Sequence, residues 1–467
     1  MRKCVILLAG LLLVLLAAGC NPPEDEGEGG NGETSAATDP ILLGFNLEKT
    51  GNAATFGISC EEGAKIAIDE LNDGGGILGR QIQPIFDDNA SKSDEAVKVA
   101  SKLISQDKVH VVIGAVASSN SIAMAAVAEE TGVPMVTPAS TNPSVTVDDD
   151  GTVRDYVFRT CFTDDFQGER IADYAVTGLG ARNAVIFYDA DNDYSVGIWE
   201  TIKRVAPSKG LNIVAEDSYL STNEQDFRAK LNKFKADDFD VLIVPGYYNQ
   251  VAMIANQARE LGIDQPFLGG DGFDSPDLWK NAGENIEGSY YTNHYASDDM
   301  DPAVQNFITK YKQTHGGNVP DAMAILGYDA VMVVAEAIRI AGSTDPDEIA
   351  AGLEQVRDFQ AATGEITINE QHNAQKKLVV IRIGEGGKLN WVYTYQPDGG
   401  EIDPTAAAGE AAGMAGEDGA MNGEAMDGAD GEAAPDDEEE AGEGTEGGEE
   451  AGDGAEGAGE AGEGQSA

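Results

Sequence analysis

The sequence predicts an α/β fold of two lobes, in which parallel strands alternate with crossover helices. From residue 41 onward, short apolar runs alternate with longer stretches of helical periodicity, as in sheets covered by helices. This part spans about 360 residues, more than a single hydrophobic core usually serves, so we expect two lobes. Strands are expected at residues 41–47, 81–86, 109–114, 183–188, 240–246 and 266–270.

Helices are expected between these strands, and the alternation of strands and helices predicts where a ligand would bind. In open parallel sheets a ligand binds beyond the carboxyl ends of the strands. With two lobes, those ends can face each other across a shared cleft, so the loops after the strands are where we expect ligand contacts. The helical stretches are residues 57–73, 92–106, 119–131, 168–178, 196–208, 225–235 and 249–261.

The first twenty residues have the composition of a membrane-targeting segment. Arg2 and Lys3 precede an apolar stretch, and small residues precede Cys20. About 15 apolar residues are too few to span a bilayer comfortably. We therefore expect a cleaved signal at residues 1–19, a lipidated Cys20, and a location outside the cytoplasm on a bacterial membrane.

Two polar segments flank the part expected to fold, residues 40–400. Residues 20–39 suit a Gly-rich tether, and residues 401–467 hold 22 Asp and Glu with no Lys or Arg, a composition that predicts disorder. The whole chain has a net charge of −52, and residues 40–400 contain 54 acidic and 28 basic residues. Such a negative surface disfavours binding to nucleic acid or to anionic lipid headgroups.

Cys60 and Cys161 are the two cysteines of the part expected to fold. Outside the cytoplasm a disulfide between them could persist, although the sequence gives no distance between them. Two unpaired buried thiols are the simpler alternative, and both interpretations stay open.

Three patterns resemble functional motifs but lack the required context. GGGILG at residues 74–79 follows a helix rather than a strand, so it predicts a helix stop and not a phosphate loop. Residues 189–200 carry carboxylates spaced as in a calcium loop, but Tyr194 replaces the necessary glycine. The four histidines lack metal-ligand spacing, and no nucleophile motif is present. We expect no enzyme activity, no cofactor and no metal.

Two loops of the first half offer hydroxyls and backbone N–H groups. AVASSNS leads into a helix near Ser119, whose N-terminus can bind an anion, although Ser118 or Ser119 could simply cap the helix. TPASTNPS follows Met135 and Val136 and places Thr141 beside amide donors, or else forms an ordinary turn.

The second half offers an acid after a strand. Ser275 and Pro276 suit the cap and first residue of the next helix, so Asp271 in GGDGF has no capping duty. Its carboxylate can accept charge-assisted hydrogen bonds from an ammonium group. Anion donors facing such an acid suit a zwitterion, for example a free amino acid. Aromatic walls could come from Tyr194, Tyr247 and Tyr248, which also follow strands.

Eight motifs occur in an order that resembles one family. They are GNAATFG, EEGAKIAIDELN, GGILGR, VVIGAVASS, PMVTPASTNPSVT, FRTCFTDDFQG, PGYYNQ and FLGGDGF. With them, residues 40 to about 395 resemble the periplasmic Leu/Ile/Val-binding family, type I substrate-binding proteins of ABC importers. The resemblance implies two Rossmann-like lobes joined by three crossover segments. Lobe 1 would comprise residues 40–162 and 296–366, and lobe 2 residues 163–295 and 367–400.

The resemblance also implies roles for individual residues. The hydroxyls of Ser118 and Thr141, with the backbone around Ala139, would hold an α-carboxylate, while Asp271 would take the α-ammonium. This chain has Asp271 where the leucine-binding type has Glu, and Phe56 where that type has Trp, which alters the depth and polarity of the pocket. The side-chain pocket would be lined by Phe56, Tyr194 and one of Tyr247 or Tyr248.

We therefore expect a monomeric, lipid-anchored receptor that passes an amino acid or similar small solute to ABC permease subunits. The ligand would favour the closed form by its differential affinity for that form. Two alternatives stay open: a sensory module that reports occupancy to a membrane receptor, and a receptor for an amide or urea.

Overall fold

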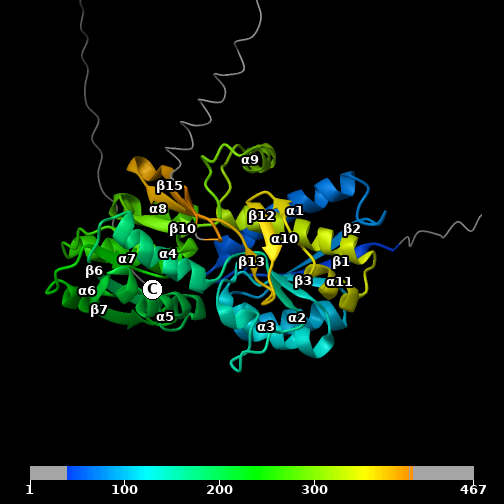
Figure 1. Cartoon of the computed structure of the whole chain (residues 1–467), viewed down its shortest axis with the longest axis horizontal. Helices are drawn as coiled ribbons and strands as arrows, with labels where there is room; N and C mark the ends of the chain where they lie inside the picture. The colour runs from blue at the N-terminus through cyan, green and yellow to red at the C-terminus, as the bar shows by residue number, and fades with distance from the viewer. Residues whose placement is uncertain (1–38, 399, 403–467) are drawn as a thin grey trace, which may run out of the picture. The chain divides into compact units, whose positions relative to one another are not determined.

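The computed structural model describes residues 39–398 and 400–402 of the 467-residue chain. Figure 1 shows these residues as two lobes, each built on a sheet with helices packed against it. The expected α/β class with two sheet-based lobes is confirmed.

Lobe 1 contains a five-stranded parallel sheet in the order β2-β1-β3-β4-β5. Its central strands are buried almost throughout, as is usual for parallel strands covered on both faces. The strands are β1 (Ile41–Leu47), β2 (Ile82–Asp88), β3 (Val111–Gly114), β4 (Met135–Thr137) and β5 (Val157–Arg159). The helices are α1 (Ala54–Asp73), α2 (Ser93–Ser105), α3 (Ser118–Thr131), η1 (Pro143–Val145), α9 (Pro302–Thr314), α10 (Ala322–Ala341) and α11 (Pro346–Leu353).

Two glycines allow α1 and α10 to pack with their backbones in contact. A Cβ atom at Gly63 would lie 1.6 Å from the Ala324 carbonyl oxygen, and one at Gly327 would lie 2.2 Å from the Cys60 carbonyl oxygen. Both distances are far below van der Waals contact, so a larger residue at either position would force the helices apart. The first turns of both helices thereby reach the cavity between the lobes.

Lobe 2 contains a mixed eight-stranded sheet in the order β16-β15-β14-β10-β9-β8-β6-β7. Strands β6 to β10 are parallel, and β14 to β16 add an antiparallel edge. The strands are β6 (Asn183–Asp189), β7 (Asn212–Tyr219), β8 (Val241–Ile243), β9 (Phe267–Gly269), β10 (Tyr290–Asn293), β14 (Leu378–Ile383), β15 (Leu389–Tyr395) and β16 (Glu401–Ile402). The helices are α4 (Asp164–Thr177), α5 (Asp193–Lys209), α6 (Arg228–Phe234), α7 (Tyr248–Glu260), η2 (Asp271–Phe273), α8 (Pro276–Ala282), η3 (Gly283–Ile286) and η4 (Glu385–Gly387).

Three segments connect the lobes, at residues 160–163, 294–301 and 376–377. The third connecting segment lies further along the chain than the sequence analysis predicted. Residues 367–375 were assigned to lobe 2, but they extend a three-stranded sheet of β11 (Phe359–Ala361), β12 (Gly364–Ile368) and β13 (Ala374–Gln375). This sheet belongs with lobe 1, because Arg159 of β5 donates its backbone N–H to the His372 carbonyl (3.0 Å) and Thr146 donates to Asn373 (3.0 Å).

The carboxyl-terminal boundary also shifts. The expected tail begins at residue 401, but Glu401 and Ile402 form β16 and pair with β15, so the sheet continues past residue 400. The predicted signal, Cys20, nearly all of the tether, and the tail from residue 403 lie outside the described residues.

The predicted strands and helices are all present, with shifted ends. The GGGILG segment forms a turn after α1, closed by a bridge between Ile77 and Arg80, as a helix stop requires. The sequence interpretation did not include β4, β5 or β7, and after η2 it included only the start of α8 at Ser275 and Pro276.

Cys60 and Cys161 are buried free thiols. Cys60 lies in α1, whereas Cys161 follows β5 and donates from Sγ to the Ser140 carbonyl oxygen (3.3 Å). The disulfide that the sequence left open is therefore absent from the structure. Burial raises the pKa of the Cys161 thiol to about 12, so this thiol stays protonated at neutral pH.

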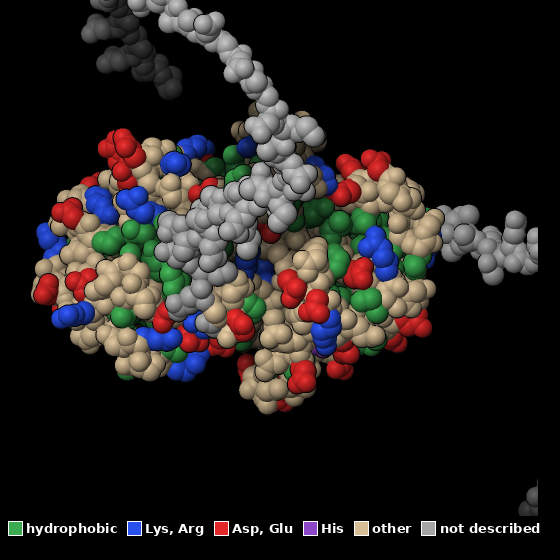
Figure 2. All heavy atoms as spheres, turned by 45° about the horizontal axis from the view of Figure 1, so that its top comes forward, with side chains coloured by type: hydrophobic (Ala, Val, Ile, Leu, Met, Phe, Trp, Pro, Cys, Tyr) green, Lys and Arg blue, Asp and Glu red, His purple; other side chains and the backbone are tan. Residues whose placement is uncertain are grey.

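Acidic side chains are spread over the face of the molecule shown in Figure 2, with Lys and Arg side chains between them. Within residues 39–398, no helix combines the length and the apolar character needed to cross a membrane.

Candidate ligand-binding site

A small closed cavity lies between the lobes, at the carboxyl ends of their parallel strands. Its free volume is about 10 Å³, roughly what one water molecule requires. An amino acid could enter only if the lobes or the lining side chains moved apart. The lining residues are Phe56, Val116, Ser118, Ala139, Tyr194, Tyr247, Asp271, Gly272 and Met323. Of the eight ligand-contact residues expected from the sequence, Thr141 and Tyr248 are not among them.

The N-terminus of α3 differs from the sequence expectation. It binds an anion, but that anion is the buried carboxylate of Glu48, which follows β1. Glu48 accepts hydrogen bonds from the N–H groups of Val116 (3.0 Å) and Ala117 (3.1 Å), and from Asn120 Nδ2 (2.7 Å). Burial raises the pKa of Glu48, while these three donors act against that rise.

Neither serine caps α3. The N-cap residue is Ala117, and Ser119 Oγ instead accepts a hydrogen bond from Asp193 N of lobe 2 (3.2 Å). Ser118 Oγ accepts one from Asn142 N (3.3 Å). The Ser118 N–H lies in the first turn of α3 and has no acceptor within the helix, and Ser118 is one of the residues that line the cavity.

The loop that carries Thr141 is held from behind by a buried arginine. Arg159 donates to the carbonyl oxygens of Ser140 (2.7 Å) and Asn142 (2.8 Å), which fixes the residue between them. Thr141 is fully buried, and its Oγ1 has no hydrogen-bond partner among the described residues. The guanidinium also places a positive charge behind this loop.

Asp271 begins η2 and is almost fully buried. Ser275 and Pro276 do form the cap and first residue of α8, as expected. Asp271 is nevertheless not entirely free, because its Oδ2 lies 3.0 Å from His294 Nε2, while Oδ1 has no partner among the described residues. His294 stacks on Phe162 with ring centroids 3.9 Å apart. Burial lowers the pKa of His294, so the neutral ring donates from Nε2 to the carboxylate.

Asp164, which the sequence analysis did not single out, is a second buried acid at this site. It is the first residue of α4, and its backbone N–H donates to the Thr141 carbonyl oxygen (2.9 Å). Neither carboxylate oxygen has a hydrogen-bond partner among the described residues. Burial raises its pKa well above the usual value, the nearby Thr141 side chain acts against this rise, and the charge of Asp271 adds to it. Gly197 permits this approach, since a Cβ there would lie 2.6 Å from Asp164 Oδ2.

Several buried polar atoms around the cavity lack partners, which is uncommon in folded proteins and calls for an explanation. Each such atom carries a desolvation cost that a bound polar ligand would relieve. They come from both lobes and from the segment that joins them. The atoms are Thr141 Oγ1, Thr160 Oγ1, both Asp164 carboxylate oxygens, Gln167 Nε2, Asp271 Oδ1 and His294 Nδ1.

Four aromatic side chains pack together at this site, and Phe56 meets Tyr248 with ring centroids 5.0 Å apart. Tyr194 and Tyr247 stack with centroids 5.2 Å apart, and Phe56 of lobe 1 meets Tyr247 edge-on at 5.3 Å. Tyr194 is also anchored, because its hydroxyl accepts the Gly272 N–H (3.0 Å). Tyr248 lies outside the cavity lining and donates its hydroxyl to Thr55 Oγ1 of lobe 1 (2.9 Å).

Hydrogen bonds between the lobes hold the cleft closed on two sides. On one side, Asn249 Nδ2 donates to the Asn52 carbonyl oxygen (2.8 Å), next to the Tyr248 contact. On the other side, Asn142 Nδ2 donates to the Asp193 carbonyl oxygen (2.7 Å). The structure is therefore a closed form of a two-lobed receptor.

The described residues contain no cluster of three or more His, Cys, Asp or Glu side chains arranged to hold a metal ion. In the segment that resembles a calcium loop, Asp189 Oδ1 accepts the N–H groups of Asp191 (3.1 Å) and Ser221 (3.1 Å). The Asp189 carboxylate is therefore used to hold the backbone of the neighbouring loops.

Two α/β lobes that close over buried, unpartnered polar groups define a solute receptor. The chain belongs to the periplasmic binding protein family, whose model matches residues 40–388. It is a substrate-binding protein of the type I fold and not an enzyme.

Individual proteins and solved structures are similar to this chain over about three quarters of its length. The Leu/Ile/Val-binding protein homolog 3 of Brucella melitensis is 30% identical over 361 residues, which cover 77% of this chain and 95% of that protein. The leucine binding protein LivK of Thermotoga maritima has 37% identity and a TM-score of 0.72, covering 77% of this chain and 99% of that one. LivJ of Streptococcus pneumoniae, solved in complex with isoleucine, has 33% identity and a TM-score of 0.69, covering 76% and 100%.

Proposed function

We propose that this protein is the extracytoplasmic receptor of an ABC importer and binds a branched-chain or similar amino acid between its lobes. The observation that carries this proposal is the set of buried polar atoms in both lobes that lack partners, among them Oδ1 of Asp271, which lines the cavity between the lobes. The relatives named for leucine, isoleucine and valine binding support it, as does the isoleucine complex of LivJ.

In this proposal the two ends of the amino acid meet different lobes. The α-carboxylate binds the hydroxyls of Ser118 and Thr141 and the backbone near Ala139, with the Arg159 charge behind that loop. The α-ammonium binds Asp271, whose Oδ1 lacks a partner. The ligand side chain lies among Phe56, Tyr194 and Tyr247, which line the present cavity.

The proposed mechanism is a shift between open and closed forms. A ligand that contacts both lobes stabilises the closed form by the difference in its affinity for the two forms. The hydrogen bonds between Asn249 and Asn52, and between Asn142 and Asp193, add to closure. The permease then recognises the closed surface and receives the solute.

The rest of the proposal concerns segments outside the described residues. A lipid on Cys20 and the tether after it would keep a monomeric receptor near its permease at high effective concentration. The acidic tail would act as a solvated spacer.

Isothermal titration of the purified protein with leucine, isoleucine and valine tests the proposal. We expect saturable binding of at least one of them, and at least tenfold weaker binding of its methyl ester, because esterification removes the carboxylate charge. Equal affinity for ester and free acid would instead favour a receptor for amides or urea. No binding of any of the three would contradict the proposal.

A further inference from the structure

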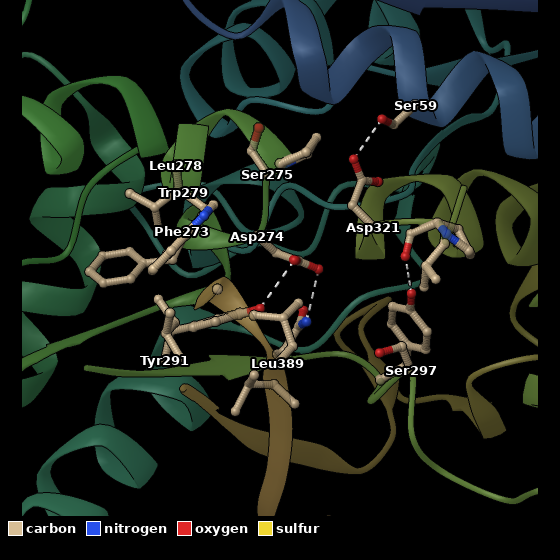
Figure 3. A pocket seen from close by; sticks show the side chains of 18 of the residues that line it. Ser59, Phe273, Asp274, Ser275, Leu278, Trp279, Tyr291, Ser297, Asp321 and Leu389 are labelled. Carbon is tan, nitrogen blue, oxygen red and sulfur yellow. Dashed lines mark hydrogen bonds between the residues drawn. The ribbon is translucent and has the colours of Figure 1, made fainter. Parts of the chain in front are cut away.

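A second, much larger cavity lies between the lobes and is lined by none of the residues that line the candidate site. Its volume is about 460 Å³, within the range of small-molecule pockets. Lobe 1 contributes α1, α9 and the segment before α10, whereas lobe 2 contributes η2, α8, β10, β14 and β15. Figure 3 shows side chains that line it, among them Asp274 and Asp321.

The charged groups that line this cavity are all acidic. They are Glu62, Asp274 and Asp321, and no Lys or Arg occurs among the described residues of the lining. Asp274 accepts hydrogen bonds from three donors: Tyr291 Oη (3.1 Å), Asn293 Nδ2 (2.9 Å) and Ala322 N (2.7 Å). These donors hold its carboxylate in one orientation at the cavity wall.

Asp321 retains capacity to accept further hydrogen bonds. It receives one from Ser59 Oγ (2.6 Å) and one from Ala324 N (3.1 Å), at the N-terminus of α10. A carboxylate has about four acceptor positions, so roughly two remain. Burial, followed by the charge of Asp274, raises the pKa of Asp321 to about 7. A cation beside these two acids would relieve their mutual repulsion.

The remaining walls are mainly aromatic and aliphatic. Aromatic faces attract cations through their quadrupoles, and apolar side chains favour an apolar ligand body. A hydrated inorganic cation would not use such walls. The aromatic residues are Phe273, Trp279, Tyr291, Tyr295 and Tyr311, and the aliphatic ones include Leu278, Val319, Ile381, Ile383 and Leu389.

We propose that this cavity is a second binding site, for a small organic cation that joins an ammonium group to an apolar or aromatic body. The ammonium donates to Asp321 beside Asp274, and the body packs against Trp279 and Leu389. The occupant contacts both lobes, so its binding depends on the angle between them. None of the residues that line it is one of those that line the smaller cavity proposed for the amino acid.

The short helix η2 lies between this cavity and the cleft. Asp271 begins η2 at the cleft, and Asp274 directly follows η2 at the second cavity. At the end of β10, His294 pairs with Asp271 and Asn293 with Asp274. A ligand in the second cavity would therefore contact Asp274, which is linked through η2 and β10 to Asp271 of the candidate ligand site.

Calorimetric titration with 2-phenylethylammonium, with 2-phenylethanol as the neutral control, tests the proposal. We expect the cation to bind at micromolar to low-millimolar concentration and the alcohol at least tenfold more weakly. In D321N, binding of the cation should weaken about tenfold through loss of a charge-assisted hydrogen bond. Asn remains a good N-cap residue, so α10 should stay intact in this variant.

A second variant tests the position of the site by steric occlusion. Leu389 is 37% exposed at the cavity edge, so L389W should fill part of the cavity without disturbing the core and should weaken the cation at least tenfold. Leu220 is 38% exposed and does not line the cavity, so L220W is a matched control that should bind like the parent protein.

The affinity for the cation should also rise between pH 5.5 and pH 8, because Asp321 ionises in this interval while an alkylammonium stays charged. D321N should lose most of this dependence. Several other titratable groups interact electrostatically with Asp321. They are Asp274 of lobe 2, Glu62 and Cys60 of α1, Tyr311 of α9, and Tyr291 and Tyr295.

Leucine titrations of the same variants keep this proposal separate from the cleft proposal, since D321N and L389W should still bind leucine. Three results would overturn the second site. They are no binding of the cation at millimolar concentration, unchanged affinity in both variants, or binding that saturating leucine and D271N abolish while D321N does not.

Discussion

The two lobes contribute chemically different groups to the candidate ligand site. On lobe 1, the anion-binding helix end is already occupied by Glu48, and Arg159 braces the hydroxyl-bearing loop from behind. On lobe 2, Asp164 and Asp271 are buried with carboxylate oxygens that lack partners. Lobe 1 therefore offers hydroxyl and N–H groups held in fixed positions, and lobe 2 offers buried carboxyl groups with unused acceptor capacity. We expect the charge on lobe 2 to dominate affinity, and the lobe 1 hydroxyls to adjust it.

Removing the lobe 2 charge should have the largest effect. D271N should weaken amino-acid binding at least tenfold, because one charge-assisted hydrogen bond exceeds the ~1.4 kcal/mol that tenfold represents. The Asn carbonyl can still accept from His294, so the fold should persist. Calorimetry with D264N, which changes an exposed acid of the same lobe, provides the control. Unchanged affinity in D271N would remove Asp271 from the site.

Removing a lobe 1 hydroxyl should have an intermediate effect. T141V keeps the side-chain shape but deletes Oγ1, and we expect amino-acid affinity to fall about fivefold, because one of several donors that share the α-carboxylate contributes ~1 kcal/mol. T131V removes an exposed hydroxyl that bonds within its own helix and should change nothing. A loss in T141V larger than that in D271N would reverse the proposed ranking of the two walls.

Weakening closure alone should have the smallest effect. N249A removes the hydrogen bond to Asn52 across the cleft without touching the cavity lining, and we expect about threefold weaker amino-acid binding. Asn256 makes a similar bond to Asn281 within lobe 2, so N256A should bind normally. If both variants bound alike, the Asn249 contact would contribute nothing to closure.

The sequence predicted the parallel cores well because their signal is local. Strands such as β1 and β6 are continuous apolar runs, and the helices between them show clear periodicity. Of the strands that were missed, β4 and β5 have three residues each, and β7 mixes apolar with charged residues, so none of them stands out as a long apolar run. The position of the third crossover depends on hydrogen bonds such as Arg159 N to His372 O, which join residues far apart in the chain.

The candidate site was predictable where a residue follows a strand, as Asp271 and Ser118 do. Asp164 and His294 were missed because a helix-start aspartate and a lone histidine look ordinary in sequence. The role of Glu48 was also hidden. It follows β1 directly, in the position where strand-end residues meet the cleft, and that position was the one available signal.

The carboxylate of Glu48 affects which amino acids the receptor can bind. A dicarboxylic amino acid such as glutamate brings a second negative charge, and the natural place for it, the helix end beside the cavity, already holds one. No Lys or Arg is present among the residues that line this cavity to compensate. The receptor should therefore reject acidic amino acids by electrostatic repulsion, before the shape of their side chains matters.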